Sequence, residues 1–190
     1  MASPQPLTAE IQGLLRQFER LLLSYGDFKH AKLAATYILS ERLHDKYPDE
    51  SYVTLPALNA SMIMAYCRPF SGNSSGVPDL PGRFLRVLSE AEREVHEMVL
   101  FDRNKLLAHS DAEALALEPV RLRVSEGREV LVPVKNWGMA PLTAEATEVF
   151  LSAATKLFEA TLFERRELES RLMPYFRVAA GPEDLYGVAE

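Results

Sequence analysis

The sequence predicts an all-α fold, a helical bundle of about five helices with a β-hairpin insert at about 120–134. Over most of the chain, hydrophobic residues recur every three or four positions, which is the spacing of one face of an α-helix. Residues 120–124 and 129–134 alternate in the manner of strands around a Ser-Glu-Gly-Arg turn. Because 190 residues suffice for one domain with a sizeable core, we expect a single helical domain over 1–175 and an irregular tail over 176–190.

Composition narrows the classes of function. The formal net charge is −6 and the pI about 5.3, so a broad positive field for general nucleic-acid binding is not expected, although a small basic pocket remains open. Cys67 is the only cysteine, which excludes an intramolecular disulfide and fits a reducing compartment. The N-terminal residues lack signal-peptide features, and no apolar run approaches the ~20 residues of a membrane span. We therefore expect a cytoplasmic protein without a membrane partner.

The first two helices are expected as an antiparallel pair. Leucines and other apolar residues at helical spacing predict one helix from about residue 7, started by Thr8 or by the Pro-rich residues before it and stopped by Gly26. Asp27 is expected to cap a second helix that runs to about Tyr47, before Pro48. The separation is so short that the two helices should pack side by side.

The remaining helices surround the hairpin. A run of few charges predicts a third and most central helix at roughly 51–66, followed by a Gly-, Ser- and Pro-rich loop at 71–82. A fourth, long helix is predicted from about Arg83 to Ala108. Thr143 is expected to cap the last helix, which should extend to about Leu172. The hairpin between them is marginal alone, so we expect it to lie on the helices or on a partner chain, with Trp137 as its anchor or as a dimer contact.

The end of the fourth predicted helix carries a dense polar cluster. Arg103 and His109 are ~120° apart on an ideal helix, and His109 can swing towards Arg103 if the helix ends near Ala108. An imidazole beside a guanidinium fits phosphodiester chemistry, because the imidazole transfers a proton while the guanidinium binds a phosphate oxygen. With RNA the 2′-hydroxyl already supplies the nucleophile. The cluster consists of Asp102, Arg103, Asn104, Lys105, His109, Ser110 and Asp111.

The run from Arg103-Asn104 to His109-Ser110-Asp111 resembles the Arg-Asn-…-His signature of the HEPN superfamily, and is most similar to its abortive-infection branch. HEPN domains are all-helical and often metal-independent ribonucleases of toxin–antitoxin and phage-defence systems. The resemblance implies a homodimer in which two motif helices face each other, an RNA substrate, no cofactor or metal, and a possible antitoxin or regulatory partner. It also implies that Arg103 and His109 carry cleavage with Asn104 in support. We expect Lys105, Ser110, Asp111 and a second cation, Arg68, to bind substrate.

Other interpretations of the same residues remain open. An Arg-Asn-Lys run is typical of a solvated helix surface. A histidine at the end of a helix is typically a capping residue. Arg68 can pair with a buried carboxylate, and Glu92, His96 and Glu97 are expected as surface charge pairs rather than as a metal site. The alternative function is a non-catalytic HEPN-like binding or dimerisation module. An ion pair of Arg103 with Asp102 or Asp111 would favour that alternative.

Overall fold

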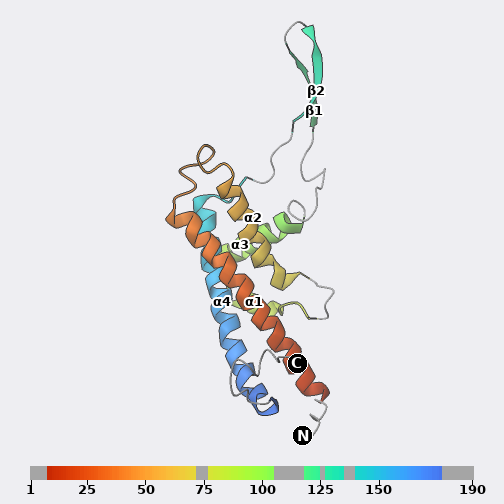
Figure 1. Cartoon of the computed structure of the whole chain (residues 1–190), viewed down its shortest axis with the longest axis vertical. Helices are drawn as coiled ribbons and strands as arrows, with labels where there is room; N and C mark the ends of the chain where they lie inside the picture. Colours follow the sequence, from red (N-terminus) through yellow and green to blue (C-terminus); the bar gives the residue numbers. More distant parts are fainter. Residues whose placement is uncertain (1–7, 72–76, 105–117, 125–126, 135–139, 177–190) are drawn as a thin grey trace, which may run out of the picture.

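The computed structural model describes residues 8–71, 77–104, 118–124, 127–134 and 140–176 (Figure 1). These residues form a helical bundle and a separate two-stranded antiparallel hairpin, so the predicted fold class is confirmed. The α-helices are α1 (Ala9–Ser40), α2 (Thr54–Cys67), α3 (Glu90–Asp102) and α4 (Ala144–Leu172). The strands are β1 (Glu118–Arg123) and β2 (Glu129–Val134), and short 3₁₀ helices are η1 (Arg68–Phe70), η2 (Gly82–Val87) and η5 (Met173–Tyr175).

Helix α1 is one continuous helix, so the predicted break at Gly26 is wrong. The hydroxyl of Thr8 caps its start and accepts a hydrogen bond from the Ile11 amide at 3.4 Å. A glycine in an exposed helix interior costs only ~1 kcal/mol, and apolar residues on both sides of Gly26 keep the same buried face. Burial of that common face outweighs the weak stop signal.

Helix α1 ends earlier than Pro48 because the chain turns at Arg42. Arg42 has a φ of 51°, in the left-handed region that usually requires glycine. The Arg42 amide donates to the Leu39 carbonyl, and the Leu43 amide donates to that of Ile38, both at 3.1 Å. These two bonds form a Schellman cap, which satisfies the terminal carbonyl groups. Arginine at this position carries no sequence signal for such a cap.

Helix α2 is the central element, as predicted. Its side chains Tyr66, Met62 and Ile63 have at most 1% of their surface exposed. The Tyr66 ring packs against Phe28 of α1 and Phe150 of α4, at centroid distances of 5.7 and 4.9 Å. Helix α2 therefore joins the two longest helices into one core.

The predicted single helix 83–108 is instead two elements. Segment η2 ends at Val87, Leu88 is extended with a ψ of 138°, and α3 starts anew after Ser89. Ser89 and Glu92 form a reciprocal capping box, in which each side chain bonds the backbone amide of the other. This start signal interrupts the run of helical periodicity.

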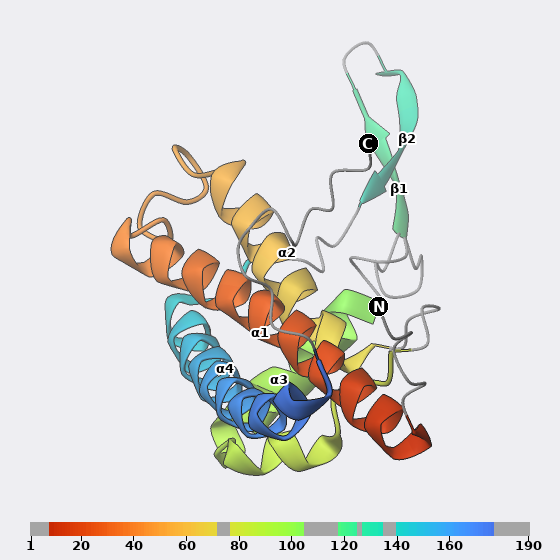
Figure 2. The ribbon, with the colours of Figure 1, turned by 60° about the horizontal axis from the view of Figure 1, so that its bottom comes forward.

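Helices α1 and α4 lie side by side along the length of the bundle and run in opposite directions (Figures 1 and 2). Thr143 caps α4 as predicted, since its hydroxyl accepts from the Ala146 amide at 3.2 Å. Helix α3 crosses the bundle and packs on α4 and α2. No helix in the described part of the chain is both long and apolar enough to cross a membrane.

The hairpin stands away from the helices in both ribbon views (Figures 1 and 2). Its register pairs Val120 with Val132 and Arg123 with Glu129, and Arg121 and Arg123 share one face because side chains alternate along a strand. Both arginines form ion pairs with Glu129, at 3.4 and 3.1 Å. The two views give no support to the expectation that the hairpin lies on the helices. Trp137 lies outside the described residues.

Candidate functional site at the end of helix α3

The structure describes only part of the predicted polar cluster. Asp102 is the last residue of α3, and Arg103 and Asn104 follow it in a single wider turn. Lys105, His109, Ser110 and Asp111 lie outside the described residues, so their positions relative to Arg103 stay a prediction. Helix α3 ends at Asp102, before the predicted end near Ala108, and the motif begins directly after it.

Arg103 is held by its neighbour Asn104. Its Nη1 donates a hydrogen bond to Asn104 Oδ1 at 2.8 Å. Its Nε is shielded from solvent and has no hydrogen-bond partner within the described ranges. In the same part of the chain, no carboxylate lies within 4.0 Å of Arg103, including that of Asp102. No carboxylate of the described residues therefore neutralises the guanidinium by direct contact.

The end of α2 lies against the end of α3 at this point. Cys67 Sγ donates to the Val99 carbonyl at 3.5 Å. Burial raises the pKa of the Cys67 thiol to about 12, while the charge of Arg103 opposes this rise and that of Asp102 adds to it. Burial likewise raises the pKa of Asp102. Cys67 is therefore an unreactive core residue, and the two charges beside it come from the cluster.

Arg68 is engaged in an ion pair. Its Nη1 lies 2.9 Å from Asp27 Oδ1, with 60% of the Arg68 side chain but only 17% of the Asp27 side chain exposed. Burial raises the pKa of Asp27, and the hydrogen bond and charge of Arg68 oppose that rise. This is the carboxylate-pairing alternative that the sequence left open. The substrate-binding role of Arg68 stays a prediction.

His96 and Glu92 are buried, which corrects the expectation of surface charge pairs. His96 Nδ1 lies 3.1 Å from Tyr66 Oη, and its ring contacts Phe70 edge to face at 4.8 Å. Glu92 accepts hydrogen bonds from Ser152 Oγ at 2.6 Å and Lys156 Nζ at 2.7 Å. These contacts fasten α3 to α2 and α4, and they hold the helix whose end carries Arg103.

One readable signal for this network was the Ser89-x-x-Glu92 capping pattern, which places Glu92 at a helix start. The burial of Glu92 and His96 had no local signal, because periodicity alone does not say which neighbour covers a face. The other histidines have structural contacts: His30 Nε2 lies 2.9 Å from Ser61 Oγ and His44 Nε2 lies 3.3 Å from Thr147 Oγ1. Among the described residues, no group of three or more His, Cys, Asp or Glu side chains could hold a metal ion.

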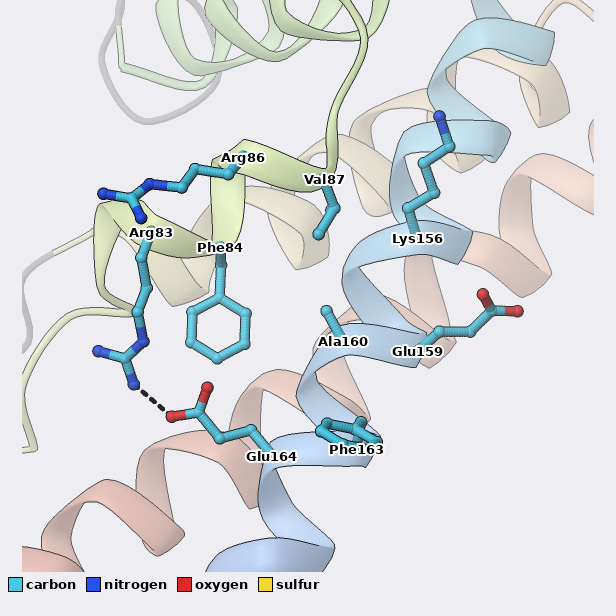
Figure 3. A pocket seen from close by; sticks show the side chains of 9 residues that line it. All are labelled: Arg83, Phe84, Arg86, Val87, Lys156, Glu159, Ala160, Phe163 and Glu164. Carbon is cyan, nitrogen blue, oxygen red and sulfur yellow. Dashed lines mark hydrogen bonds and ion pairs between the residues drawn. The ribbon is translucent and has the colours of Figure 1, made fainter.

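Two cavities lie away from the polar cluster, beside η2 and α4. The wider is an open depression of about 530 Å³, with Phe84, Val87, Ala160 and Phe163 inside and charged residues around them (Figure 3). The smaller, of about 170 Å³, shares Arg83, Phe84 and Glu164 with the first and reaches Arg20 of α1. Arg103 lines neither of them.

Comparisons of the chain with protein-family models, with curated proteins and with solved structures found no significant match.

Proposed function

We propose that the protein is a metal-independent endoribonuclease of HEPN type, a cytoplasmic phage-defence or toxin effector that acts as a homodimer. The observation that supports this most is the state of Arg103. It follows the last residue of α3, is hydrogen-bonded by Asn104, and has no carboxylate within ion-pair distance in the described part of the chain. An arginine committed to a structural ion pair would have argued against the proposal.

The chemistry assigns one role to each residue of the motif. The guanidinium of Arg103 binds a non-bridging phosphate oxygen and stabilises the charge that develops on it. His109 takes the proton from the 2′-hydroxyl or gives one to the leaving 5′-oxygen. The 2′-oxygen attacks the adjacent phosphorus, the bond to the 5′-oxygen breaks, and the products carry a 2′,3′-cyclic phosphate and a 5′-hydroxyl. Asn104 orients Arg103 through the 2.8 Å hydrogen bond.

The exposed face of α3 supports a homodimer. Met98 and Phe101 are one turn apart on this helix, and 39% and 57% of their surfaces are exposed. Both precede the motif by less than two turns. A second copy of the chain packed on α3 would cover these two side chains. On an ideal helix both lie ~140–160° from Arg103, so this contact alone does not bring two Arg103 residues together, and the facing motifs stay an implication of the resemblance to HEPN domains.

A second candidate, a non-catalytic binding or dimerisation module, is favoured by the direction of Arg103. On an ideal helix Arg103 lies within ~20° of His96, and His96 is on the packed side of α3. The guanidinium is consequently only partly accessible. In this alternative, Arg103 and Asn104 order the end of α3 and bind an anion without cleaving it.

The two candidates are separated by comparing RNA binding with RNA cleavage. The protein would be incubated in EDTA with an oligoribonucleotide and with a 2′-deoxy version of the same strand. The endoribonuclease proposal expects both strands to bind and only the ribose strand to be cut, because the deoxy strand lacks the nucleophile. Binding of both strands without cleavage of either one would favour the binding module.

A further inference from the structure

We propose that Arg20 and Arg83 form a binding site for a small oxyanion, a carboxylate or phosphate group, in the cavity between α1 and the start of η2. The cavity measures about 170 Å³ and lies apart from Arg103, so the proposal does not depend on ribonuclease activity. Residues from three elements line it: Gln17, Arg20 and Leu21 of α1, the segment Pro78, Asp79, Pro81, Arg83 and Phe84, and Glu164 of α4.

Arg20 is the main reason for this assignment. Only 3% of its surface is exposed, which is unusual for an arginine without a carboxylate partner. Its Nε donates to the Pro78 carbonyl, and its Nη2 lies 3.5 Å from the Val77 carbonyl. Its Nη1 has no acceptor among the residues that the structure describes. A buried guanidinium thus has donors left over and lines a cavity.

No nearby carboxylate neutralises Arg20 by direct contact. Within the described ranges, no Asp or Glu oxygen lies within 4.0 Å of it. Asp27, further along α1, is ion-paired with Arg68 at 2.9 Å, and it feels the charge of Arg20 only across a longer distance. A buried charge is stable only when it is paired and hydrogen-bonded, so an anion from solution would complete the surroundings of Arg20.

Arg83 supplies the second cation. It lines the same cavity from η2 and forms an ion pair with Glu164, which Figure 3 shows as a dashed line. Half of the Arg83 side chain is exposed, so the remaining donors of its guanidinium are free to turn towards a ligand. Two guanidinium groups from different elements can donate hydrogen bonds to one oxyanion from two sides.

The dimensions and the walls limit the ligand. At ~30 Å³ per water molecule, 170 Å³ corresponds to about five or six waters, which fits a phosphate ion or a short carboxylic acid. Leu21, Phe84 and two prolines form apolar walls, and Gln17 adds one neutral hydrogen-bonding group. The cavity also has two carboxylates: Glu164 is taken up by Arg83, and Asp79 is exposed. They oppose anions of high charge and favour a single oxyanion group.

The test is a titration of the full chain with sodium phosphate and, separately, with sodium acetate, at constant ionic strength maintained with sodium chloride. Isothermal calorimetry would measure binding, and thermal unfolding would measure stabilisation. We expect saturable binding of at least one of the two anions, with a matching rise in Tm. The anion that binds more tightly shows whether the site prefers phosphate or carboxylate. If neither anion binds beyond the effect of chloride, the proposal is wrong.

Two variants in η2 localise the site. Arg83→Gln should weaken anion binding by about tenfold or more, the effect of losing a charge-assisted hydrogen bond. Arg86→Gln is the matched control, because Arg86 is exposed, lies in the same segment and lines only the wider depression. We expect unchanged binding in this control. Equal binding by the two variants would contradict the assignment.

Arg20→Lys tests the buried cation itself. Lysine keeps the charge but lacks the planar fork, so a folded variant should bind the anion at least about tenfold more weakly. Full binding by a folded Arg20→Lys protein would overturn the role of Arg20. If this variant does not fold, the comparison of Arg83→Gln with Arg86→Gln decides the proposal alone, since both residues are at the surface.

Discussion

Arg103 donates a hydrogen bond from Nη1 to Oδ1 of its chain neighbour Asn104, across 2.8 Å. This contact fixes one edge of the guanidinium without neutralising it. An asparagine is suited to this task, because its amide oxygen accepts a hydrogen bond and carries no charge that would repel a phosphate.

The first prediction concerns the lack of charge on the Asn104 side chain. Asn104→Asp keeps the size of the side chain but gives Arg103 a carboxylate partner beside the phosphate site. We expect RNA cleavage to fall by about fivefold or more, the effect of ~1 kcal/mol of unfavourable charge interaction in the transition state. Initial rates of oligoribonucleotide cleavage would measure this. An Asn104→Asp protein that cleaves as fast as the wild type would show that Asn104 has no such role.

The second prediction concerns Glu92, which joins α3 to α4. Glu92→Gln should lower the free energy of unfolding by about 1–2 kcal/mol, because charged hydrogen bonds to Ser152 and Lys156 become neutral or are lost. The loss stays below the ~3–5 kcal/mol of a fully buried pair, since 41% of the Lys156 side chain is exposed. Urea unfolding would measure it. The control Glu159→Gln, at an exposed position of α4, should change stability by less than ~0.5 kcal/mol.

The same carboxylate should make the protein sensitive to acid. Burial by itself raises the pKa of Glu92, but the hydrogen bonds from Lys156, Ser152 and Ser89 outweigh burial and lower it to about 2 from an ordinary 4.5. Since the folded pKa is depressed, the stabilisation is full above pH 4.5 and is lost as the pH falls towards 2. The stability difference between wild type and Glu92→Gln should therefore shrink across this window. A constant difference would contradict the assignment.

The third prediction concerns His96. Burial lowers its pKa below the ordinary 6.5, and the charge of Glu97 opposes this. The unfolded chain consequently binds a proton before the folded one, so His96 destabilises the fold progressively as the pH falls below 6.5. We expect His96→Gln to reduce the slope of Tm against pH between about 6.5 and 5. Equal slopes for wild type and His96→Gln would exclude this role.

The fourth prediction tests the continuity of α1. Gly26 lies in the exposed middle of the helix, and a Cβ added there meets nothing within 4 Å. Gly26→Ala should therefore raise the free energy of unfolding by about 0.5–1 kcal/mol. Gly127→Ala is the contrasting variant, because Gly127 has a φ of 74° that alanine adopts only with strain. Destabilisation by Gly26→Ala would indicate that the helix breaks at this glycine in solution.

The parts of the fold that were predictable carry their signal in a few adjacent residues. Thr8 and Thr143 cap the two long helices through hydrogen bonds that their hydroxyl groups accept from backbone amides three residues later. Such a cap depends only on adjacent residues, so it can be predicted from the sequence. The hairpin follows from alternation and from its turn. The predicted helix stop at Gly26 is wrong because the burial of one face of α1 outweighs the weak preference of glycine against helix. The end of α1 at Arg42 could not be predicted, because arginine has no preference for the left-handed conformation that it adopts there.

The position of the candidate site along the chain could be predicted better than the residues that surround it in the fold. The sequence predicts the polar cluster late in a helix that ends near Ala108, whereas α3 ends at Asp102 and Arg103 follows it. It does not indicate that Arg103 lies next to the buried Cys67, or that His96 on the same face is covered by Tyr66 and Phe70. Those neighbours come from α2 and η1, and only the packed fold brings them to α3.

The most direct test of the proposed function compares the wild type with Arg103→Ala and His109→Ala. Each purified protein would be incubated with total RNA in EDTA, with folding checked by circular dichroism. Arg93→Ala, an exposed arginine of the same helix, is the control for loss of positive charge. The proposal predicts cleavage by the wild type and by Arg93→Ala that yields 2′,3′-cyclic phosphate ends, and none by the other two variants. Cleavage that persists in both Arg103→Ala and His109→Ala, or its absence in a well-folded wild-type dimer, would contradict it.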